Sequence, residues 1–419
     1  MGRRHSVAAA GRGGLTVGWN LALYTVYRHW GLDPRGYFAL GLTLHAICSA
    51  LVFALVLVVT RRLGCAWAGG LLFAMLPSHH EAVTWCSAAL HPLAAVPLVT
   101  AVIAWVLYRR GTRAALAVAL VAATMALLTK DSAVSLWPLL ALLDWGAFPG
   151  RDRRPLLWLG LPYAAMIAWR IVCPPSQEVI AVGSAAYRPG LHILSNLALA
   201  PPQTLIPDLR FENYQAMLSR VLPGPAVHAA LGASVAAILC VSVLALIGLV
   251  KGSRMVKVGI AWLYLGFLPM LPFSYEYARA PRYGYIASIG LAFLVAPLID
   301  WAARRRWRRS ALIAAAVVFA LISVGFLRMV CANRLRDSVV RREVIAAVRA
   351  AVPSPAPNTQ FVLSGLPPYL DDLWRAIPVY YYPTPVQAAA AEMPPAAGYQ
   401  LRFDPAHPGR LLECLRMGP

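Results

Sequence analysis

Two polar segments, LPSHHEAVTW at residues 76–85 and TKD at residues 129–131, interrupt a part of the chain that is otherwise almost entirely apolar. An apolar stretch, an arginine-containing turn and a second apolar stretch separate them. A chain that crosses a membrane twice returns to its starting side, so two apolar spans would bring both polar segments to the same face. We therefore expect these segments to meet, and the fold to be organised around them.

The composition indicates a membrane protein. Of the 419 residues, 59% are hydrophobic and only 13% are charged, whereas about a quarter of the residues of a soluble domain are charged. We expect an all-α polytopic protein of the cell membrane with about ten transmembrane helices. The expected spans are residues 38–60, 65–77, 87–108, 114–129, 132–145, 156–172, 226–250, 258–273, 286–302 and 311–329.

The net charge of +21 comes mostly from arginines in short clusters between the apolar segments. This distribution follows the positive-inside rule of membrane proteins. No basic face is interleaved with aromatic residues on a soluble segment, so we expect no nucleic-acid partner. The seven cysteines are scattered without a Cys-x-x-Cys pair, which argues against a disulfide framework.

Three regions differ in composition. Residues 1–37 hold a basic tail and a short helix, which either lies along the membrane interface or forms a short span. Residues 38–330 form the transmembrane domain, and residues 331–419 have the composition of a small soluble α/β domain. The elements expected in that last domain are an amphipathic helix at 334–352 and strands at 360–363 and 399–403.

The basic turns fix an orientation for the spans. They follow Thr60, Tyr108, Trp145, Val250 and Ala302, which are alternate ends of the expected spans. A single orientation makes all of them cytoplasmic. The opposite, outer face then receives residues 77–85, Lys130, the connection 173–225, the loop 274–285 and the C-terminal domain.

Ionisable residues close the second span, at His79, His80 and Glu81. Such groups are costly at membrane depth, which favours a functional role over a solvated interfacial loop. Histidine and glutamate are also metal ligands, and His91 lies further along the chain, so a divalent metal site is an alternative. Adjacent His79 and His80 point in different directions on a helix, which makes them a poor pair of ligands.

Lys130 and Asp131 occupy a tight outer turn between two short spans. A lysine at this depth is a suitable partner for a lipid phosphate. The alternatives are a local ion pair with Asp131 and a side chain that reaches out to the membrane surface.

The loop SYEYARAPRYGY, residues 274–285, carries Glu276, Arg279, Arg282 and Tyr283. Arginines on the outer face depart from the positive-inside pattern, so a local interaction should hold them. Arginine binds phosphate with two parallel hydrogen bonds, and tyrosine stacks on sugars. The alternative is an ordinary aromatic belt at the membrane interface.

Four motifs occur in a characteristic order. They are the segment 37–52 with His45, PSHHEAVTW at 77–85, LTKD at 128–131 and RYGYIASIG at 282–290. In this order they resemble the GT-C membrane glycosyltransferases, in particular the protein O-mannosyltransferase-like branch that includes the transmembrane proteins with tetratricopeptide repeats. The resemblance covers roughly residues 15–330.

The resemblance implies transfer of a sugar from a polyprenyl-phosphate donor to an acceptor on the outer side of the membrane, with no cofactor. By position, Lys130, Arg282 and Arg279 would contact the donor phosphate. His79 and Glu81 would line the same cavity. The partners that it implies are the lipid-linked donor, membrane lipid and an acceptor that the sequence does not identify.

The sequence also departs from that family. The family's general base is an acidic residue in a first outer loop, after a first span, and neither that span nor that loop is present in this sequence. Asp33 and Glu81 are the only acidic residues before Asp131, which leaves Glu81 as the nearest candidate base. Four other positions differ from the family pattern, namely Leu76, Ala89, His91 and Pro281. Either the chain begins downstream of the true start, or catalysis has been lost.

Three functions therefore stay open. The first is a membrane glycosyltransferase. The second is a non-catalytic protein that binds a lipid-linked glycan. The third is a transporter or metal-handling protein that uses His79, His80, Glu81 and His91; the spans show no repeated half of the kind common in transporters.

Overall fold

The computed structural model describes residues 17–150, 152–172, 190–205, 215, 218–219, 222–273, 280–366, 386–390, 398–404 and 406–417. The chain forms two compact units, Met1–Leu327 and Arg328–Pro419. The basic tail before residue 15 and most of the connection 173–225 lie outside the described residues.

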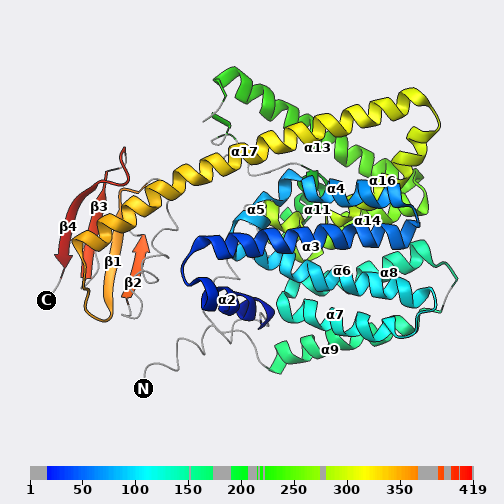
Figure 1. Ribbon diagram of the computed structural model, residues 1–419, viewed down its shortest axis with the longest axis horizontal. Coiled ribbons are helices and arrows are strands. Elements are labelled where there is room, and N and C mark those ends of the chain that lie inside the picture. The colour runs from blue at the N-terminus through cyan, green and yellow to red at the C-terminus, as the bar shows by residue number, and fades with distance from the viewer. Residues whose placement is uncertain are drawn as a thin grey trace. The chain divides into compact units, whose positions relative to one another are not determined.

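The first unit is helical (Figure 1). Each of the ten segments expected to be a span contains an α-helix in the structure, although α14 ends at Phe267, before the expected residue 273. Its helices are α2 Val17–Trp30, α3 Pro34–Thr60, α4 Leu63–Met75, α5 His80–Thr84, α6 Leu90–Arg109, α7 Ala115–Thr129, α8 Leu136–Ala147, α9 Pro155–Val172, α11 His192–Leu205, α13 Gly224–Lys251, α14 Arg254–Phe267, α16 Ile289–Ala303 and the first part of α17 Arg306–Ala351.

Four of the described helical segments are long and apolar enough to cross a membrane. They are Pro34–Thr60, Cys86–Arg109, Gly224–Lys251 and Arg306–Ala351. Shorter apolar helices occur at Leu63–Met75, Ala115–Thr129, Ser132–Ala147, Pro155–Trp169 and Ile289–Ala303. The membrane character of the chain therefore rests on helix length and composition.

The ends of α3 show how the sequence sets helix boundaries. Asp33 caps the first turn, where its side chain accepts a hydrogen bond from the backbone N–H of Arg35. Pro34 follows at the first helical position, where its missing N–H is not needed. The helix ends at Arg61, which adopts a left-handed conformation with a φ of 58°.

One boundary differs from the expectation. The expected last span, 311–329, and the expected amphipathic helix, 334–352, form one continuous 46-residue helix, α17. Residues 326–351 contain neither proline nor glycine, so nothing in this part of α17 interrupts the backbone hydrogen bonds.

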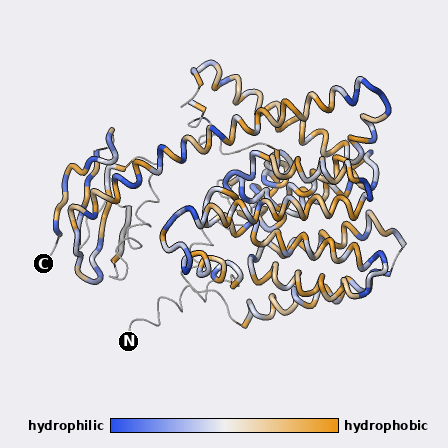
Figure 2. The backbone as a smooth tube through the Cα atoms, viewed as in Figure 1, coloured by the Kyte–Doolittle hydropathy of each residue, from blue (hydrophilic) through white to orange (hydrophobic). Residues whose placement is uncertain are grey.

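Basic turns gather at one end of the first unit. Arg62, after α3, forms an ion pair with Asp300 of α16. Arg110, after α6, donates a hydrogen bond to the carbonyl oxygen of Val59 at 3.3 Å. Arg109 donates to the carbonyl oxygen of Asp152 beyond α8 at 2.6 Å. The turns after α3, α6, α8 and α16 thus lie together, and hydrophilic turns mark this end in Figure 2.

Glycines bring α14 and α16 into backbone contact. A Cβ atom added at Gly290 would overlap the carbonyl oxygen of Gly259, and one added at Gly259 would lie 2.9 Å from the carbonyl oxygen of Gly290. Small residues allow such close approach between helices in membranes, where van der Waals packing is a main source of association. The pairing holds α16 in place beside the rest of the unit.

We expect Gly290→Ala to lower the free energy of unfolding by about 1–3 kcal/mol, because the added methyl group must push the two backbones apart. Gly232→Ala is the matched control, since a Cβ atom at Gly232 of α13 meets nothing within 4 Å. Thermal unfolding in detergent measures both. Equal midpoints for the two variants would contradict the close approach.

The second unit contains the end of α17 and a four-stranded sheet in the order β2-β1-β3-β4. The strands are β1 Thr359–Ser364, β2 Val386–Ala390, β3 Gly398–Phe403 and β4 Leu411–Met417. Strand β1 pairs in parallel with β2 and β3, and β4 pairs antiparallel to β3. The expected strands at 360–363 and 399–403 are therefore confirmed as β1 and β3.

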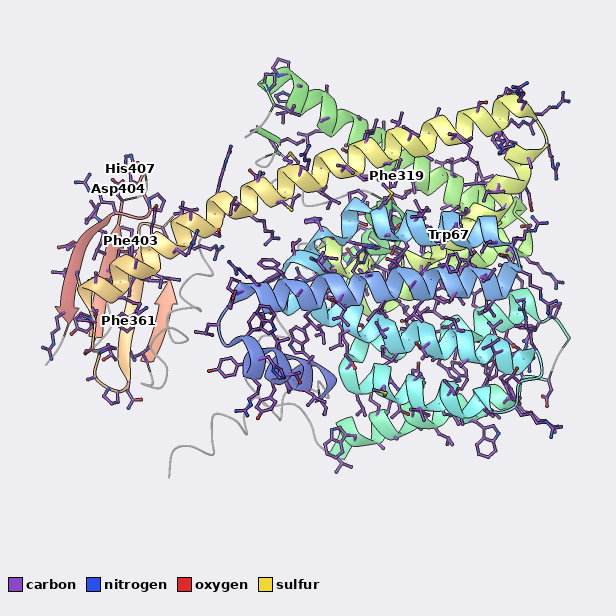
Figure 3. The ribbon with its side chains drawn as sticks, viewed as in Figure 1. Trp67, Phe319, Phe361, Phe403, Asp404 and His407 are labelled. Carbon is purple, nitrogen blue, oxygen red and sulfur yellow. The ribbon has the colours of Figure 1, made fainter. Side chains whose placement is uncertain are left out.

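The core of the second unit forms between helix and sheet. Val344 and Val348 on α17 are buried with Phe361 of β1 and Phe403 of β3, both labelled in Figure 3. Asp404, after β3, accepts hydrogen bonds within the turn that leads to β4. The apolar face that the sequence indicates at 334–352 thus packs on the sheet.

Candidate functional site

The first polar segment folds back on itself because of a proline. Leu76 is extended, since a residue that precedes proline avoids the helical region, and α4 therefore ends at Met75. Pro77–His79 form a 3-10 turn, α5 follows, and Trp85 is again extended. Gly41 of α3 allows α5 to lie close, because a Cβ atom there would overlap the carbonyl oxygen of Val83.

The polar side chains of this segment are buried. The exposed fractions of Ser78, His79, His80 and Glu81 are 1%, 2%, 7% and 4%. These values contradict the alternative of a solvated interfacial loop. Buried polar groups need partners, and the partners decide where each side chain belongs.

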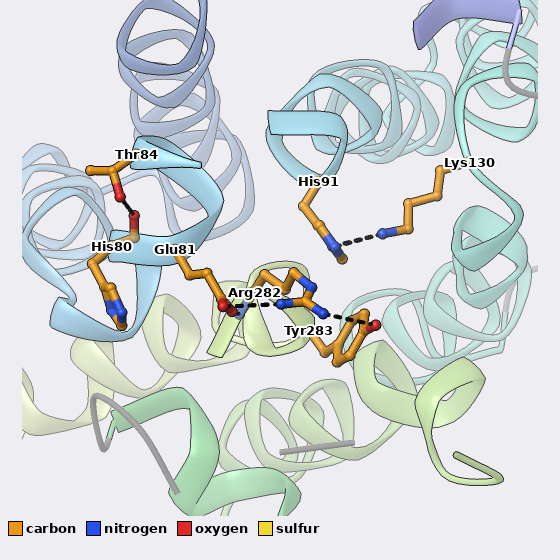
Figure 4. A network of polar contacts seen from close by, with 7 residues as sticks. All are labelled: His80, Glu81, Thr84, His91, Lys130, Arg282 and Tyr283. Atoms are coloured by element: carbon orange, nitrogen blue, oxygen red, sulfur yellow. Dashed lines mark hydrogen bonds and ion pairs between the residues drawn. The ribbon is translucent and has the colours of Figure 1, made fainter. Parts of the chain in front are cut away.

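Glu81 pairs with Arg282, which lies 201 positions further along the chain. The distance from Arg282 Nη1 to Glu81 Oε1 is 3.0 Å, and the two side chains are only 16% and 5% exposed. The guanidinium carbon of Arg282 also lies 4.8 Å from the ring centre of Trp85 and 4.7 Å from that of Tyr283. Figure 4 shows Arg282 between Glu81 and Tyr283.

Lys130 reaches the same place from the end of α7. Its Nζ donates a hydrogen bond to His91 Nε2 at 2.6 Å and lies 5.8 Å from the ring centre of Tyr283. The His91 ring lies 5.5 Å from the Tyr283 ring, nearly edge-on. The polar segments 76–85 and 129–131 therefore come together at one place, as expected. Arg282 contacts the first segment, and Tyr283 lies between Arg282 and Lys130.

The cationic site is formed by Glu81, His91, Lys130, Arg282 and Tyr283. Lysine and arginine both lie within cation–π distance of the Tyr283 ring. Two cations and one carboxylate among these described side chains give the site a net positive charge. An anion with several oxygen atoms, such as a phosphate, would bind such a group with charge-assisted hydrogen bonds.

His79 belongs to a different cluster, although it precedes Glu81 by only two residues. Its Nε2 donates a hydrogen bond to Ser288 Oγ at 2.8 Å, and its ring lies 4.5 Å from that of Tyr285. Burial, together with the neighbouring His45, lowers the pKa of His79 well below its usual value. His79 is therefore neutral and anchors the segment that follows Arg282, rather than lining the cationic site.

The second half of this cluster joins α3 to the same segment. His45 Nε2 donates to the carbonyl oxygen of Ala74 at 3.2 Å, so its Nδ1 accepts from the hydroxyl group of Tyr285 at 2.8 Å. Burial raises the pKa of Tyr285 well above its usual value, which keeps the hydroxyl protonated as this bond requires. The bonds from Tyr285 to His45 and from Ser288 to His79 fix the backbone segment that follows Arg282.

The metal alternative finds no support among the described residues, where no three histidine, cysteine, aspartate or glutamate side chains gather. His80 Nδ1 donates to the carbonyl oxygen of Pro77 at 2.9 Å. His79 and His91 bond to Ser288 and Lys130. Glu81 pairs with Arg282, so the four residues suggested as ligands have four different partners.

Three other residues expected at the site cannot be placed in it. Glu276, Arg279 and the side chain of Asp131 lie outside the described residues. Two residues of the site were missed by sequence reasoning. Trp85 was quoted only as part of a motif, and His91 was considered only as a metal ligand and as a departure from the family pattern. The sequence alone does not show which side chains face Arg282 and Lys130.

An apolar cavity includes Cys86, the residue after Trp85, in its lining. Its volume is about 260 Å³, and its lining includes Leu32, Tyr37, Phe38 and Cys86. Cys86 directly follows Trp85, whose ring contacts Arg282. A charged site and an apolar cavity are therefore adjacent along the chain.

No protein-family model, curated protein or solved structure matches this chain.

Proposed function

We propose that this chain is a multi-pass membrane protein of about ten spans that binds a polyprenyl-phosphate-linked sugar and transfers the sugar to an acceptor on the outer face. The observation that carries the proposal is the convergence of Lys130 and Arg282 on Tyr283. Lys130 and Arg282 are 152 positions apart in the chain, and both place a cation at the ring of Tyr283. A sugar linked to lipid through phosphate offers the anion for these cations and a ring for the tyrosine.

The apolar cavity supports a lipid as the carrier of the phosphate. Leu32, Tyr37 and Phe38 offer a surface for hydrocarbon next to the segment that holds Trp85. A soluble sugar nucleotide would gain nothing from such a surface. The first segment of a polyprenyl chain would bury apolar area there at about 25 cal/mol per Å².

The proposed orientation follows from the gathering of the basic turns. Arg62, Arg109 and Arg110 lie at one end of the first unit, and Glu81 and Lys130 belong to turns at the other ends of the same helices. If the basic end is cytoplasmic, the cationic site faces outward, and so does the C-terminal unit.

In the proposed reaction, an acceptor hydroxyl group attacks C1 of the sugar while the bond from C1 to the phosphate oxygen breaks. Lys130 and Arg282 would stabilise the charge that develops on the leaving phosphate. The hydroxyl proton needs a base. Glu81 is the carboxylate of the site, but its Oε1 pairs with the Arg282 guanidinium group and its Oε2 accepts a hydrogen bond from the backbone N–H of Arg282 at 3.4 Å.

That ion pair favours a second candidate, a non-catalytic protein that binds the lipid-linked glycan. A carboxylate that is 5% exposed and held by a guanidinium group is poorly placed to take a proton from an incoming acceptor. Binding without turnover by the purified protein, in the presence of varied acceptors, would favour this candidate over the transferase.

The direct test measures binding of polyprenyl phosphate to the purified full-length protein. We expect Lys130→Ala to weaken binding about 10–150-fold, because one charge-assisted hydrogen bond contributes about 1.5–3 kcal/mol. Lys251→Ala, at the exposed end of α13, removes the same charge elsewhere and should change binding less than about twofold. Equal affinities for both variants would refute the cationic site.

A further inference from the structure

A second basic cluster lies in the turn between α16 and α17, at the opposite end of the first unit from the cationic site. Trp301 precedes the cluster and Trp307 lies within it, and the two side chains are 44% and 64% exposed. Tryptophan is enriched where a membrane protein meets the lipid headgroups. The arginines of this turn are Arg304, Arg305, Arg306, Arg308 and Arg309.

One of these arginines is held in place by the tryptophans. The guanidinium carbon of Arg308 lies 4.8 Å from the ring centre of Trp301 and 5.4 Å from that of Trp307. The two rings stand at 81° to each other, with centres 6.3 Å apart. Arg308 Nε is buried without a hydrogen-bond partner in the described structure. The side chain is thus oriented by stacking and keeps hydrogen-bonding capacity for a ligand.

Negative charge is scarce around this turn. The nearest carboxylate along α16, Asp300, is ion-paired with Arg62. Within the described part of the chain, none of the five arginines of the turn forms an ion pair. Like charges placed this close repel one another, and bound anions would relieve that repulsion.

The surface next to the turn is apolar. On α17, Ile313, Val317 and Leu321 are 55%, 52% and 67% exposed and repeat at intervals of four residues, which places them on one face of the helix. A ligand at the turn would therefore meet arginines at one end and a hydrocarbon-compatible helix face at the other. That combination fits an amphiphile and excludes a purely polar anion as the best partner.

We infer that the turn between α16 and α17 is a binding site for an anionic phospholipid, with the phosphate on Arg308. Trp301 and Trp307 hold the guanidinium group so that it presents two N–H groups to the phosphate oxygens. The acyl chains lie along the exposed face of α17. The site is independent of the cationic site and of the sugar chemistry proposed for it.

The test uses the full-length protein in detergent, titrated with phosphatidylglycerol, with phosphatidylcholine and with inorganic phosphate, and native mass spectrometry counts the bound molecules. We expect phosphatidylglycerol to bind at least about tenfold more tightly than phosphatidylcholine, because only the former carries net negative charge to meet the basic cluster. Inorganic phosphate should not compete at equal concentration, because it has no chains to place on α17.

Two variants that each remove one positive charge distinguish a specific phospholipid site from nonspecific electrostatic attraction of the anionic lipid. Arg309→Gln removes one surface charge and should weaken phosphatidylglycerol binding about fivefold. Arg308→Gln also removes the oriented hydrogen bonds and should weaken it at least about tenfold further. Trp307→Leu, which keeps every charge, should weaken binding more than Arg309→Gln does.

Equal losses for Arg308→Gln and Arg309→Gln would overturn the inference, since they would reveal only nonspecific attraction. Equal binding of the two phospholipids, or full competition by inorganic phosphate, would overturn it too. Unchanged thermal unfolding of each variant without added lipid, compared with the natural chain, shows that the fold is intact. A variant that unfolds earlier is replaced by Arg308→Lys, which keeps the charge and loses the planar fork.

Discussion

We expect Arg282→Ala to abolish polyprenyl-phosphate binding, with a loss of at least about a hundredfold in affinity. Arg282 supplies the larger of the two cationic groups at Tyr283, and a guanidinium group can bind a phosphate with two parallel hydrogen bonds. Each charge-assisted bond contributes about 1.5–3 kcal/mol, so the loss of two exceeds the effect expected at Lys130. Equilibrium binding of polyprenyl phosphate to the purified protein measures the change.

The alanine variant has a second effect that must be separated from the first. It leaves Glu81, which is 5% exposed, without its ion-pair partner. Removal of one partner of a buried pair costs about 3–5 kcal/mol of folding free energy. Arg282→Lys is therefore the matched variant, because lysine keeps the charge beside Glu81 but not the planar fork. We expect it to fold and still to bind at least about tenfold more weakly.

Glu81→Gln distinguishes the two candidate functions. It releases the guanidinium group of Arg282 from its carboxylate, so polyprenyl-phosphate binding should be kept or strengthened. If the chain is a transferase and Glu81 is its base, sugar transfer falls while binding of polyprenyl phosphate stays.

Arg349→Ala, which changes an exposed arginine near the end of α17, is the control for all binding assays. Undiminished binding by Arg282→Ala and Arg282→Lys would refute the site.

The broad fold could be predicted from the sequence because its physical signals extend over many residues. Apolar length marks each helix and basic residues follow five of them, and each of the ten expected segments contains a helix. Counting helices predicts that residues 81, 130 and 282 share one face, and the family resemblance implied that they line one cavity; the contacts through Arg282 and Tyr283 agree with both. Strand β3 alternates between apolar and polar residues, and β1 carries a short apolar run, and both patterns are typical of strands.

The assignment of each side chain within the meeting place could not be predicted. His79 and Glu81 sit two positions apart, and a 3-10 turn followed by a short α-helix sends them to different partners. That path depends on where Pro77 stops α4 and on how closely Gly41 lets α5 approach α3. The stop at Pro77 is a local effect, but the approach of α5 to α3 is a tertiary one. A single helical periodicity through residues 76–85 would therefore place these side chains on the wrong faces.

The ion pair of Arg109 with Asp144 was missed for a related reason. Asp144 lies within a segment read as a membrane span, where a lone carboxylate looks like an interruption. The available signal was its position along the chain. Asp144 lies in the last helical turn of α8, just before the basic connection to the next helix. A carboxylate at that depth needs a cation from a neighbouring helix, and α6 provides one.

We expect Asp144→Asn to lower the free energy of unfolding by about 3–5 kcal/mol, because it leaves Arg109 without its counter-ion in the interior. The Arg109 and Asp144 side chains are 5% and 0% exposed, and Nε lies 2.6 Å from Oδ1. Nη2 donates a hydrogen bond to Oδ2 at 3.1 Å, so the guanidinium group contacts both carboxylate oxygens. Asparagine keeps the shape of the side chain but loses the charge, which isolates the electrostatic part. Chemical or thermal unfolding in detergent measures the change.

Asp300→Asn is the matched control on the same end of the unit. It breaks the ion pair with Arg62, whose two side chains are 56% and 50% exposed, and should cost no more than about 1 kcal/mol. Equal costs for the two variants would mean that burial gives Arg109 and Asp144 no special role. The double variant Arg109→Leu with Asp144→Leu should recover much of the loss, since an apolar pair removes both buried charges together.

The consequence of this pair reaches the other end of α6. That helix begins one residue before His91, which holds Lys130, and ends at Arg109, which Asp144 fixes to α8. Loss of the attachment at Arg109 lowers the stability of the fold, while the bond between His91 and Lys130 at the other end of α6 persists in the folded molecules. Asp144→Asn should therefore weaken polyprenyl-phosphate binding only in proportion to the unfolded fraction at low temperature, and more steeply as the temperature rises toward the unfolding midpoint.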